Sequence, residues 1–145
     1  SITNSNAAGS VIWIASAGIT NAATNNIIRN CTIIGGGTAS GIAGIIAGSG
    51  ATLGSAAEAP NSNNTITGNT FKSAQNGIYV NGNAVTYDQN WLISNNNFGS
   101  ATIAAEKMGY RGLSVQGVNN FTITGNNVLG IVISSSSPAF RSCSL

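Results

Sequence analysis

The chain has 145 residues, of which only eight are charged, and no histidine, so its formal net charge is +2. Without histidine there is no imidazole for acid–base catalysis or metal binding, and so small a positive charge does not favour a nucleic-acid partner. Hydrophobic residues make up 42% of the chain, yet no apolar run is long enough to span a bilayer. Asn, Ser, Thr and Gly must therefore supply the surface polarity, as is typical of a rigid extracellular scaffold.

A six-residue phrase, Ile-x-x-Asn-x-Phe or a close variant, occurs four times along the chain. Its copies are Ile28–Ile33, Ile66–Phe71, Ile93–Phe98 and Ile123–Val128. The interval between copies varies, as expected when turns tolerate insertions and strands do not. Such copies predict a repeat protein in which each unit stacks on the next to bury its apolar face.

A second phrase, Gly-Ile-x-Val or a relative of it, falls between the copies of the first. Its copies are Gly41–Ile45, Gly77–Val80, Gly112–Val115 and Gly130–Ile133, with Val11–Ile14 as an earlier member. Apolar residues alternate within these segments, which indicates strands with one buried face. We therefore expect two short strands in each repeat and about five turns in the chain.

The first phrase contains a bend. Ile66 and Phe71 are expected to point inward from adjoining strands, with Gly68 at the bend, where permissive backbone dihedrals are needed. The next residue is asparagine in three copies: Asn69, Asn96 and Asn126. Stacked in a column, these amides would form a hydrogen-bonded asparagine ladder. Cys31 occupies this column in the earliest copy, so the ladder would end or be interrupted there.

Together the two phrases resemble the right-handed parallel β-helix repeat of the pectin-lyase-like superfamily, over roughly Val11 to Ser134. The resemblance implies an all-β solenoid of about five coils with an asparagine ladder. We expect β-helix repeats over residues 1–134 and a linker or the start of a further unit over 135–145, because four serines and a proline do not readily continue a packed strand. The superfamily includes polysaccharide lyases, glycoside hydrolases, phage tailspikes, adhesins and non-catalytic surface proteins, so the fold alone does not indicate the function.

Carboxylates are scarce: the chain contains only Glu58, Asp88 and Glu106. Lyases of the superfamily hold calcium with clustered acidic residues and use an Arg or Lys base, and its hydrolases use several aspartates. Neither set can be matched here. We therefore predict no catalytic residue, metal ligand or cofactor in this chain, and the sequence favours a protein that is not an enzyme.

One candidate glycan-binding group follows a Gly-Ile-type strand. Tyr87, Asp88 and Trp91 could form a shallow platform, with aromatic rings stacking on sugar rings and a carboxylate binding hydroxyls. The simpler alternative, which we prefer, is that Trp91 packs under the loop and Asp88 caps a turn.

A second candidate group concentrates cations near the opposite turn. Lys72, Lys107 and Arg111 could bind an acidic sugar, since a guanidinium offers two parallel donors to a carboxylate. The preferred alternative is a solvated loop in which Glu106 pairs with Arg111 or Lys72.

These features predict a structural or adhesive segment of a larger bacterial protein, extracellular or at the cell surface, that contacts a polysaccharide or glycan through its loops. One alternative is a fragment of a polysaccharide lyase or glycoside hydrolase whose catalytic residues lie outside this chain. Another is a β-helix component of a larger extracellular assembly, covered by other chains. No nucleic-acid partner and no membrane span are expected.

Overall fold

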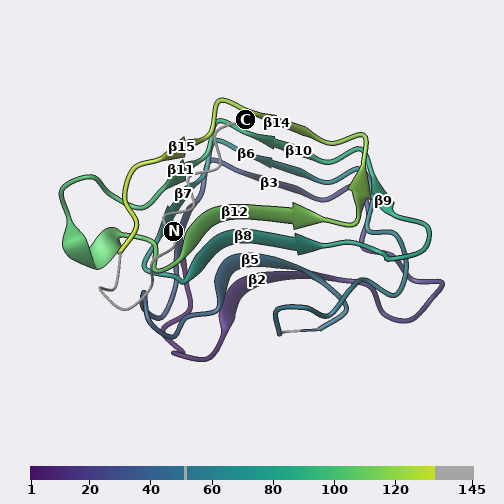
Figure 1. Cartoon of the computed structure of the whole chain (residues 1–145), viewed down its shortest axis with the longest axis horizontal. Helices are drawn as coiled ribbons and strands as arrows, with labels where there is room; N and C mark the ends of the chain where they lie inside the picture. The colour runs from purple at the N-terminus through teal and green to yellow at the C-terminus, as the bar shows by residue number, and fades with distance from the viewer. Residues whose placement is uncertain (51, 133–145) are drawn as a thin grey trace.

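The computed structural model describes residues 1–50 and 52–132. The predicted linker at 135–145 and the last residue of the Gly130–Ile133 phrase lie outside the described residues. The described chain is all-β, and its strands stack in parallel sheets, an arrangement consistent with a β-solenoid (Figure 1). Its one helical element is a single 3₁₀ turn, η1 (Ala104–Glu106). No described helix is long and apolar enough to cross a membrane.

Within residues 1–50 and 52–132, three main sheets and one two-stranded sheet run along the stack. The long-strand sheet contains β2 (Ser10–Ala15), β5 (Ala43–Gly48), β8 (Asn76–Asn81) and β12 (Arg111–Gln116). The isoleucine sheet contains β3 (Ile27–Arg29), β6 (Thr65–Thr67), β10 (Leu92–Ser94) and β14 (Thr122–Thr124). The phenylalanine sheet contains β1 (Ile2–Thr3), β4 (Thr32–Ile34), β7 (Thr70–Lys72), β11 (Asn97–Phe98) and β15 (Asn127–Val128). The small sheet pairs β9 (Asp88–Gln89) with β13 (Val118–Asn119).

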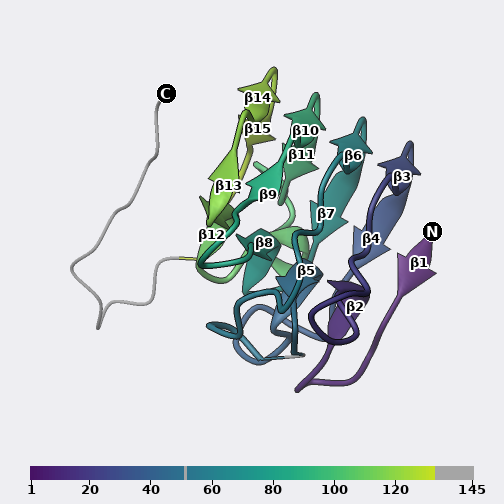
Figure 2. The same ribbon diagram turned by 90° about the vertical axis from the view of Figure 1, so that its right-hand side faces the viewer.

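The four copies of the first phrase pair in register, as the repeat predicts. Their leading isoleucines, Ile28, Ile66, Ile93 and Ile123, lie opposite one another across the isoleucine sheet. Their last residues, Ile33, Phe71, Phe98 and Val128, do the same across the phenylalanine sheet. Figure 2 shows the resulting strand pairs, such as β6 with β7, as successive layers. The prediction that each copy pairs with its neighbours is confirmed.

The bend inside the first phrase separates each copy into two adjoining strands, as predicted. The bend residues Asn30, Gly68, Asn95 and Gly125 have φ values of 55°, 65°, 54° and 62°. This left-handed conformation suits Gly and Asn, which confirms the prediction of a permissive bend. Each repeat therefore contributes three main strands, and the expectation of two is wrong.

The second phrase forms the long-strand sheet, with two corrections to its predicted alignment. Ile45 pairs with Ile78, which places Gly77 level with Gly44 rather than Gly41. Ile131 bridges to Met108, outside β12, so the described part of the Gly130 copy, residues 130–132, adds no strand to this sheet. Loops of unequal length separate the strands, so the phrase alone does not fix the register.

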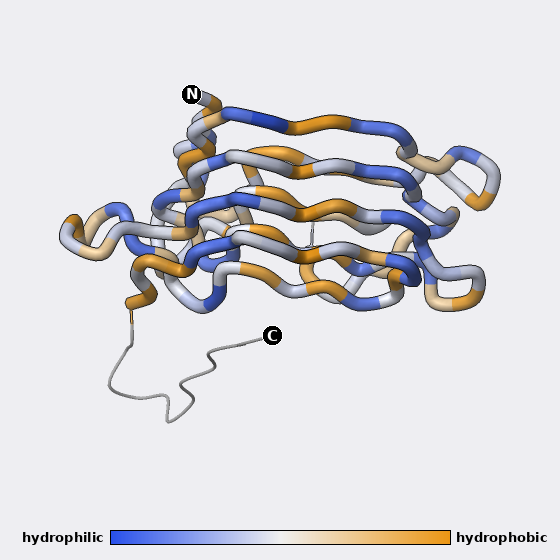
Figure 3. Tube along the Cα trace, turned by 90° about the horizontal axis from the view of Figure 1, so that it is seen from above, coloured by the Kyte–Doolittle hydropathy of each residue, from blue (hydrophilic) through white to orange (hydrophobic). Residues whose placement is uncertain are grey.

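The core lies between the sheets and is continuous along the stack. Its buried apolar side chains come from all three main sheets, and Ile66, Phe71 and Ile78 are fully buried. The rings of Phe71 and Phe98 stack with centroids 4.9 Å apart. Figure 3 shows apolar segments aligned from one strand to the next. Parallel pairing places equivalent residues of successive repeats above one another.

Candidate functional site

The asparagines at the bend form a hydrogen-bonded column. The side-chain Oδ1 of Asn96 accepts from the backbone N of Asn69 at 2.9 Å and from its Nδ2 at 3.1 Å. Asn126 Oδ1 receives the same two bonds from Asn96, at 3.0 and 2.9 Å. At the other end, the backbone N of Cys31 donates to Asn69 Oδ1 at 3.0 Å. Cys31 contributes only this backbone donor, so the side-chain column begins at Asn69.

A second polar column, which the sequence analysis missed, lies where the long-strand sheet turns toward the isoleucine sheet. The backbone N of Ala23 donates to Asn61 Oδ1 at 2.7 Å, and the backbone N of Asn61 donates to Asp88 Oδ1 at 2.9 Å. The intervals along the chain are 38 and 27 residues, the same as those from Cys31 to Asn69 and from Asn69 to Asn96. The repeat period could therefore have revealed this column.

Two of the three residues in the predicted sugar platform are buried. Trp91 is 1% exposed and its Nε1 donates to the carbonyl of Asn61 at 2.6 Å, so it offers no ring face to a sugar. Asp88 is fully buried, and only Tyr87, at 44%, is exposed. The platform of Tyr87, Asp88 and Trp91 therefore does not form. The packing alternative describes this region, because the large indole fills the core beneath the loop.

The three predicted cations have different surroundings. Lys72 Nζ pairs with Glu106 Oε1 at 2.9 Å, which joins β7 to η1. Lys107 follows η1 and lies close to the position that a side chain on Gly130 would take. Arg111 lies instead against two tyrosine rings. A binding site made jointly by Lys72 and Arg111 is not supported, since Glu106 neutralises the lysine.

Replacing Lys72 with alanine should therefore change stability little. Its ion pair is partly exposed, and such pairs contribute about 0–1 kcal/mol. Urea denaturation of Lys72→Ala at low and high salt would measure this, and the small difference from wild type should shrink further at high salt. A loss of several kcal/mol that persists in high salt would contradict this account of the pair.

The outer face of the long-strand sheet carries a row of neighbouring side chains that the sequence analysis did not select. Trp13 lies beside Ile46, Ile46 beside Tyr79, and Tyr79 beside Ser114. Trp13 is 52% exposed, whereas Ile46 and Tyr79 are buried in a small cluster separate from the main core. Trp13 and Tyr79 occupy equivalent positions in the Val11–Ile14 and Gly77–Val80 copies, and that alignment could have identified them.

Arg111 lies at the β12 end of this row. Its guanidinium carbon is 4.5 Å from the centre of the Tyr110 ring and 5.8 Å from that of Tyr79. Its Nη1 donates to Ser114 Oγ at 3.1 Å, while its buried Nε has no hydrogen-bond partner among the described residues. The two tyrosine rings contact the guanidinium by cation–π interaction, which uses none of its hydrogen-bond donors.

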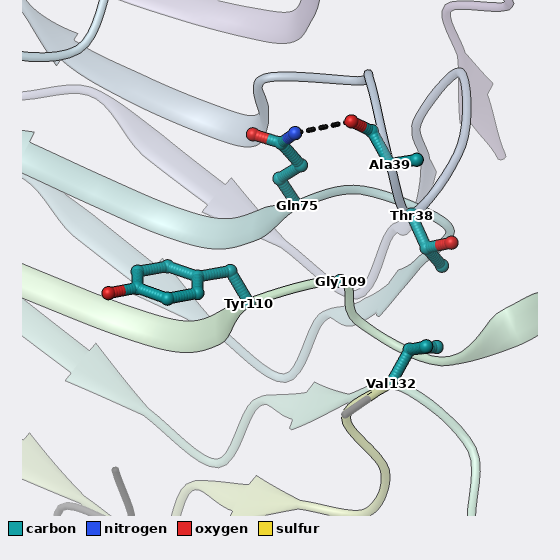
Figure 4. A pocket seen from close by; sticks show the side chains of 6 residues that line it. All are labelled: Thr38, Ala39, Gln75, Gly109, Tyr110 and Val132. Atoms are coloured by element: carbon teal, nitrogen blue, oxygen red, sulfur yellow. Dashed lines mark hydrogen bonds between the residues drawn. The ribbon is translucent and has the colours of Figure 1, made fainter. Parts of the chain in front are cut away.

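A pocket of about 340 Å³ adjoins Arg111 through Tyr110. Figure 4 shows its lining: Thr38, Ala39, Gln75, Gly109, Tyr110 and Val132. Gln75 Nε2 donates to the carbonyl of Ala39 at 2.5 Å, which ties two walls of the pocket together. The pocket therefore combines an exposed aromatic ring, amide and hydroxyl groups, and a neighbouring cation.

This face is the candidate functional site, because it carries an exposed tryptophan on β2, a guanidinium on β12 that contacts two tyrosine rings, and a polar pocket beside Tyr110. Among residues 1–50 and 52–132, no three His, Cys, Asp or Glu side chains gather in a group that could hold a metal ion. A scan against known protein families found no matching family, and searches of curated proteins and of solved structures found no similar protein.

Proposed function

We propose that the chain is a right-handed parallel β-helix of about five coils, of the pectin-lyase-like kind. In this proposal it is a structural or adhesive segment of a secreted or surface-displayed protein. The observation that carries the proposal is that each of the three carboxylates is either buried or bonded to another group of the chain. Asp88 is fully buried, and Glu106 is paired with Lys72. Glu58 Oε2 accepts a hydrogen bond from the backbone N of Gly18. A scaffold role needs no free acid, whereas glycoside cleavage needs acidic groups placed beside the substrate.

Adhesion would use the outer face of the long-strand sheet. The guanidinium of Arg111 suits the carboxylate of an acidic sugar, to which it can donate two parallel hydrogen bonds. The exposed rings of Trp13 and Tyr110 suit the apolar faces of sugar rings, and Gln75 supplies an amide for hydroxyls. The ligand proposed for this face is therefore an acidic polysaccharide lying across the strands.

Glycan-array binding of the intact chain, with mass spectrometry of acidic and neutral polysaccharides after incubation, tests this function. We expect retention of acidic glycans without cleavage. Arg111→Gln should weaken binding about tenfold or more, the effect of losing hydrogen bonds to a charged group. Trp13→Ala should weaken it through lost stacking.

Arg29→Gln is the matched control, because Arg29 is an exposed cation on the isoleucine sheet, away from the proposed site. Equal losses of glycan binding in Arg29→Gln and Arg111→Gln would show that net charge alone causes the effect. That result would contradict a binding site at Arg111. Unsaturated or hydrolysed products would instead favour the alternative of a lyase or hydrolase fragment.

A role in a larger extracellular assembly is the second candidate, and one observation favours it. Val128 is 56% exposed, whereas Phe98 and Phe71, its neighbours in the same column, are fully buried. β12, β14 and β15 are also the last strands of their sheets among the described residues. Sedimentation velocity over a range of protein concentrations would test it, with a concentration-dependent increase in mass expected.

A further inference from the structure

Two loops converge on the carboxylate of Asp88. The backbone N of Asn61, in the loop that follows β5, donates to Asp88 Oδ1 at 2.9 Å. The backbone N of Asn83, in the loop that follows β8, donates to the same oxygen at 3.0 Å. Asp88 itself lies in β9 and is fully buried. One buried carboxylate oxygen thus holds two loops from successive coils.

Asn83 extends this connection to neighbouring backbone. Its Nδ2 donates to the carbonyls of Ala57 and Glu58 at 2.9 and 3.0 Å. Its Oδ1 accepts from the backbone N of Val85 at 2.9 Å and of Thr86 at 2.8 Å. The loop of residues 82–87 is therefore shaped by Asn83 and held to the preceding coil. Freeing the Asn83 amide from Asp88 would loosen both loops together.

Glu58 links a third loop, which contains Ser16 and Gly18, to the two loops that bond to Asp88. Its backbone N donates to Ser16 Oγ at 2.8 Å, and its Oε2 accepts from the backbone N of Gly18 at 2.5 Å. We call the loops of residues 16–24, 52–63 and 82–87 the corner loops, since all three leave the long-strand sheet on the side that leads to the isoleucine sheet (Figure 1). Asp88 lies at the buried centre of their hydrogen bonds.

The second oxygen of Asp88 has no compensating partner. Oδ2 is buried without a hydrogen bond among the described residues, and no described lysine or arginine forms an ion pair with Asp88. The titratable groups nearest in the network are Glu58, whose carboxylate bonds to Gly18, and Tyr87, whose side chain is exposed. Burial therefore raises the pKa of Asp88, and the backbone donors Asn83 and Asn61, together with the Trp91 side chain, only partly oppose it.

We propose that Asp88 makes the corner loops a proton-sensitive latch, closed most firmly when Oδ2 carries a proton and loosened when the carboxylate is ionised. In the closed corner the ionised carboxylate is buried, with one oxygen unpartnered. When the loops open, water reaches that oxygen and stabilises the negative charge. The proton is taken from or released to solvent, so the step needs no other reactant.

The direction of the pH dependence follows from linkage. In the open corner, Asp88 should titrate near its ordinary pKa of 3.8, and in the closed corner its pKa is higher. Between these two pKa values the closed form binds more protons than the open form, so opening becomes more favourable as pH rises. Below 3.8 both forms are protonated, and above the raised pKa both are ionised, so the dependence disappears at either end.

Native-state hydrogen exchange of the intact chain, corrected for intrinsic amide rates, tests the latch. The opening constants at the Asn61 and Asn83 amides should rise by up to about tenfold per pH unit within the window. The amides of Asn69 and Asn96, which bond to asparagine side chains instead, should show no such rise. Equal pH dependence at all four amides, or none at Asn61 and Asn83, would overturn the proposal.

The Asp88→Asn variant tests whether titration of this carboxyl group causes the pH dependence of loop opening. This variant keeps an acceptor oxygen for both loop amides but cannot titrate, so the opening constants should become independent of pH. Persistence of the dependence in the variant would overturn the latch. A side-chain carbon NMR titration of Asp88 in the wild type gives a readout that does not require the variant to fold, and a midpoint at or below 3.8 would also overturn it.

Discussion

Asn96→Ala should cost about 3–5 kcal/mol of unfolding free energy, because several buried polar groups would lose their partners at once and each costs about 1–3 kcal/mol. Asn96 is fully buried. Its Oδ1 satisfies both the backbone N and the side-chain Nδ2 of Asn69, and its own Nδ2 donates to the carbonyl of Ile66 at 2.9 Å. Alanine can replace none of these bonds. Urea denaturation followed by circular dichroism would measure the loss.

The adjacent Asn97 provides a matched control. Its Oδ1 accepts one exposed hydrogen bond, from Asn127 Nδ2 at 3.1 Å. Asn97→Ala should therefore cost less than about 1 kcal/mol, the usual net effect of such a bond. If the two alanine variants were destabilised equally, the ladder would have no special part in stability. Asn96→Asp should also be strongly destabilised, because it retains the acceptor but loses the donors and buries a charge.

The repeat and the asparagine ladder could be predicted from sequence because similar residues recur at equivalent positions, and these positions lie above one another in the stack. Ile66, Ile93 and their counterparts face one core, and Asn69, Asn96 and Asn126 face one bend. Parallel pairing converts a recurring interval along the chain into direct contact. Because the phrase occurs four times, its period predicted which residues would lie next to one another in the stack.

The second polar column, formed by Ala23, Asn61 and Asp88, was also encoded in the repeat period, but neither sequence phrase indicated it. Trp91 lies one period after the buried Asn64, as Asp88 lies one period after the buried Asn61. The candidate sugar platform required Trp91 and Asp88 to be exposed, whereas the preferred alternative packed Trp91 under the loop and used Asp88 to cap a turn. Alignment by repeat would have placed both residues beside buried asparagines of the preceding repeat.

The repeat period could not predict the site around Arg111. Tyr110 and Gly109 belong to the long loop between β11 and β12, whereas Thr38 and Ala39 belong to the loop between β4 and β5. These loops differ in length and sequence, and neither recurs. Only the folded chain shows that they meet beside Arg111. Arg111 itself was among the glycan-binding candidates that the sequence indicated. The pairing of Lys72 with Glu106 was among the alternatives that the sequence offered.

Gly77→Ala is expected to destabilise the fold by about 1–3 kcal/mol, the usual cost of forcing an extra methyl group into a packed core. A Cβ at Gly77 would lie 2.3 Å from Phe98 Cδ1 and 2.4 Å from the carbonyl oxygen of Gly112. Neither neighbour can move freely, because Phe98 stacks on Phe71 and Gly112 belongs to β12. Gly44 has the same relation to Phe71, with a Cβ position 2.5 Å from Cδ1. The glycine of one phrase thus makes room for the aromatic residue of the other.

A double-mutant cycle with Phe98→Leu tests whether this contact causes the loss. Leucine removes the ring edge that the new methyl group would strike, so Gly77→Ala should cost less in the Phe98→Leu background than in the wild type. The remaining cost would reflect the carbonyl of Gly112, which the leucine does not relieve. Ser114→Ala, on the outer face of β12, serves as the control and should show no coupling with Gly77→Ala. Strictly additive costs for Gly77→Ala and Phe98→Leu would mean that the glycine is required by the backbone of β12 alone.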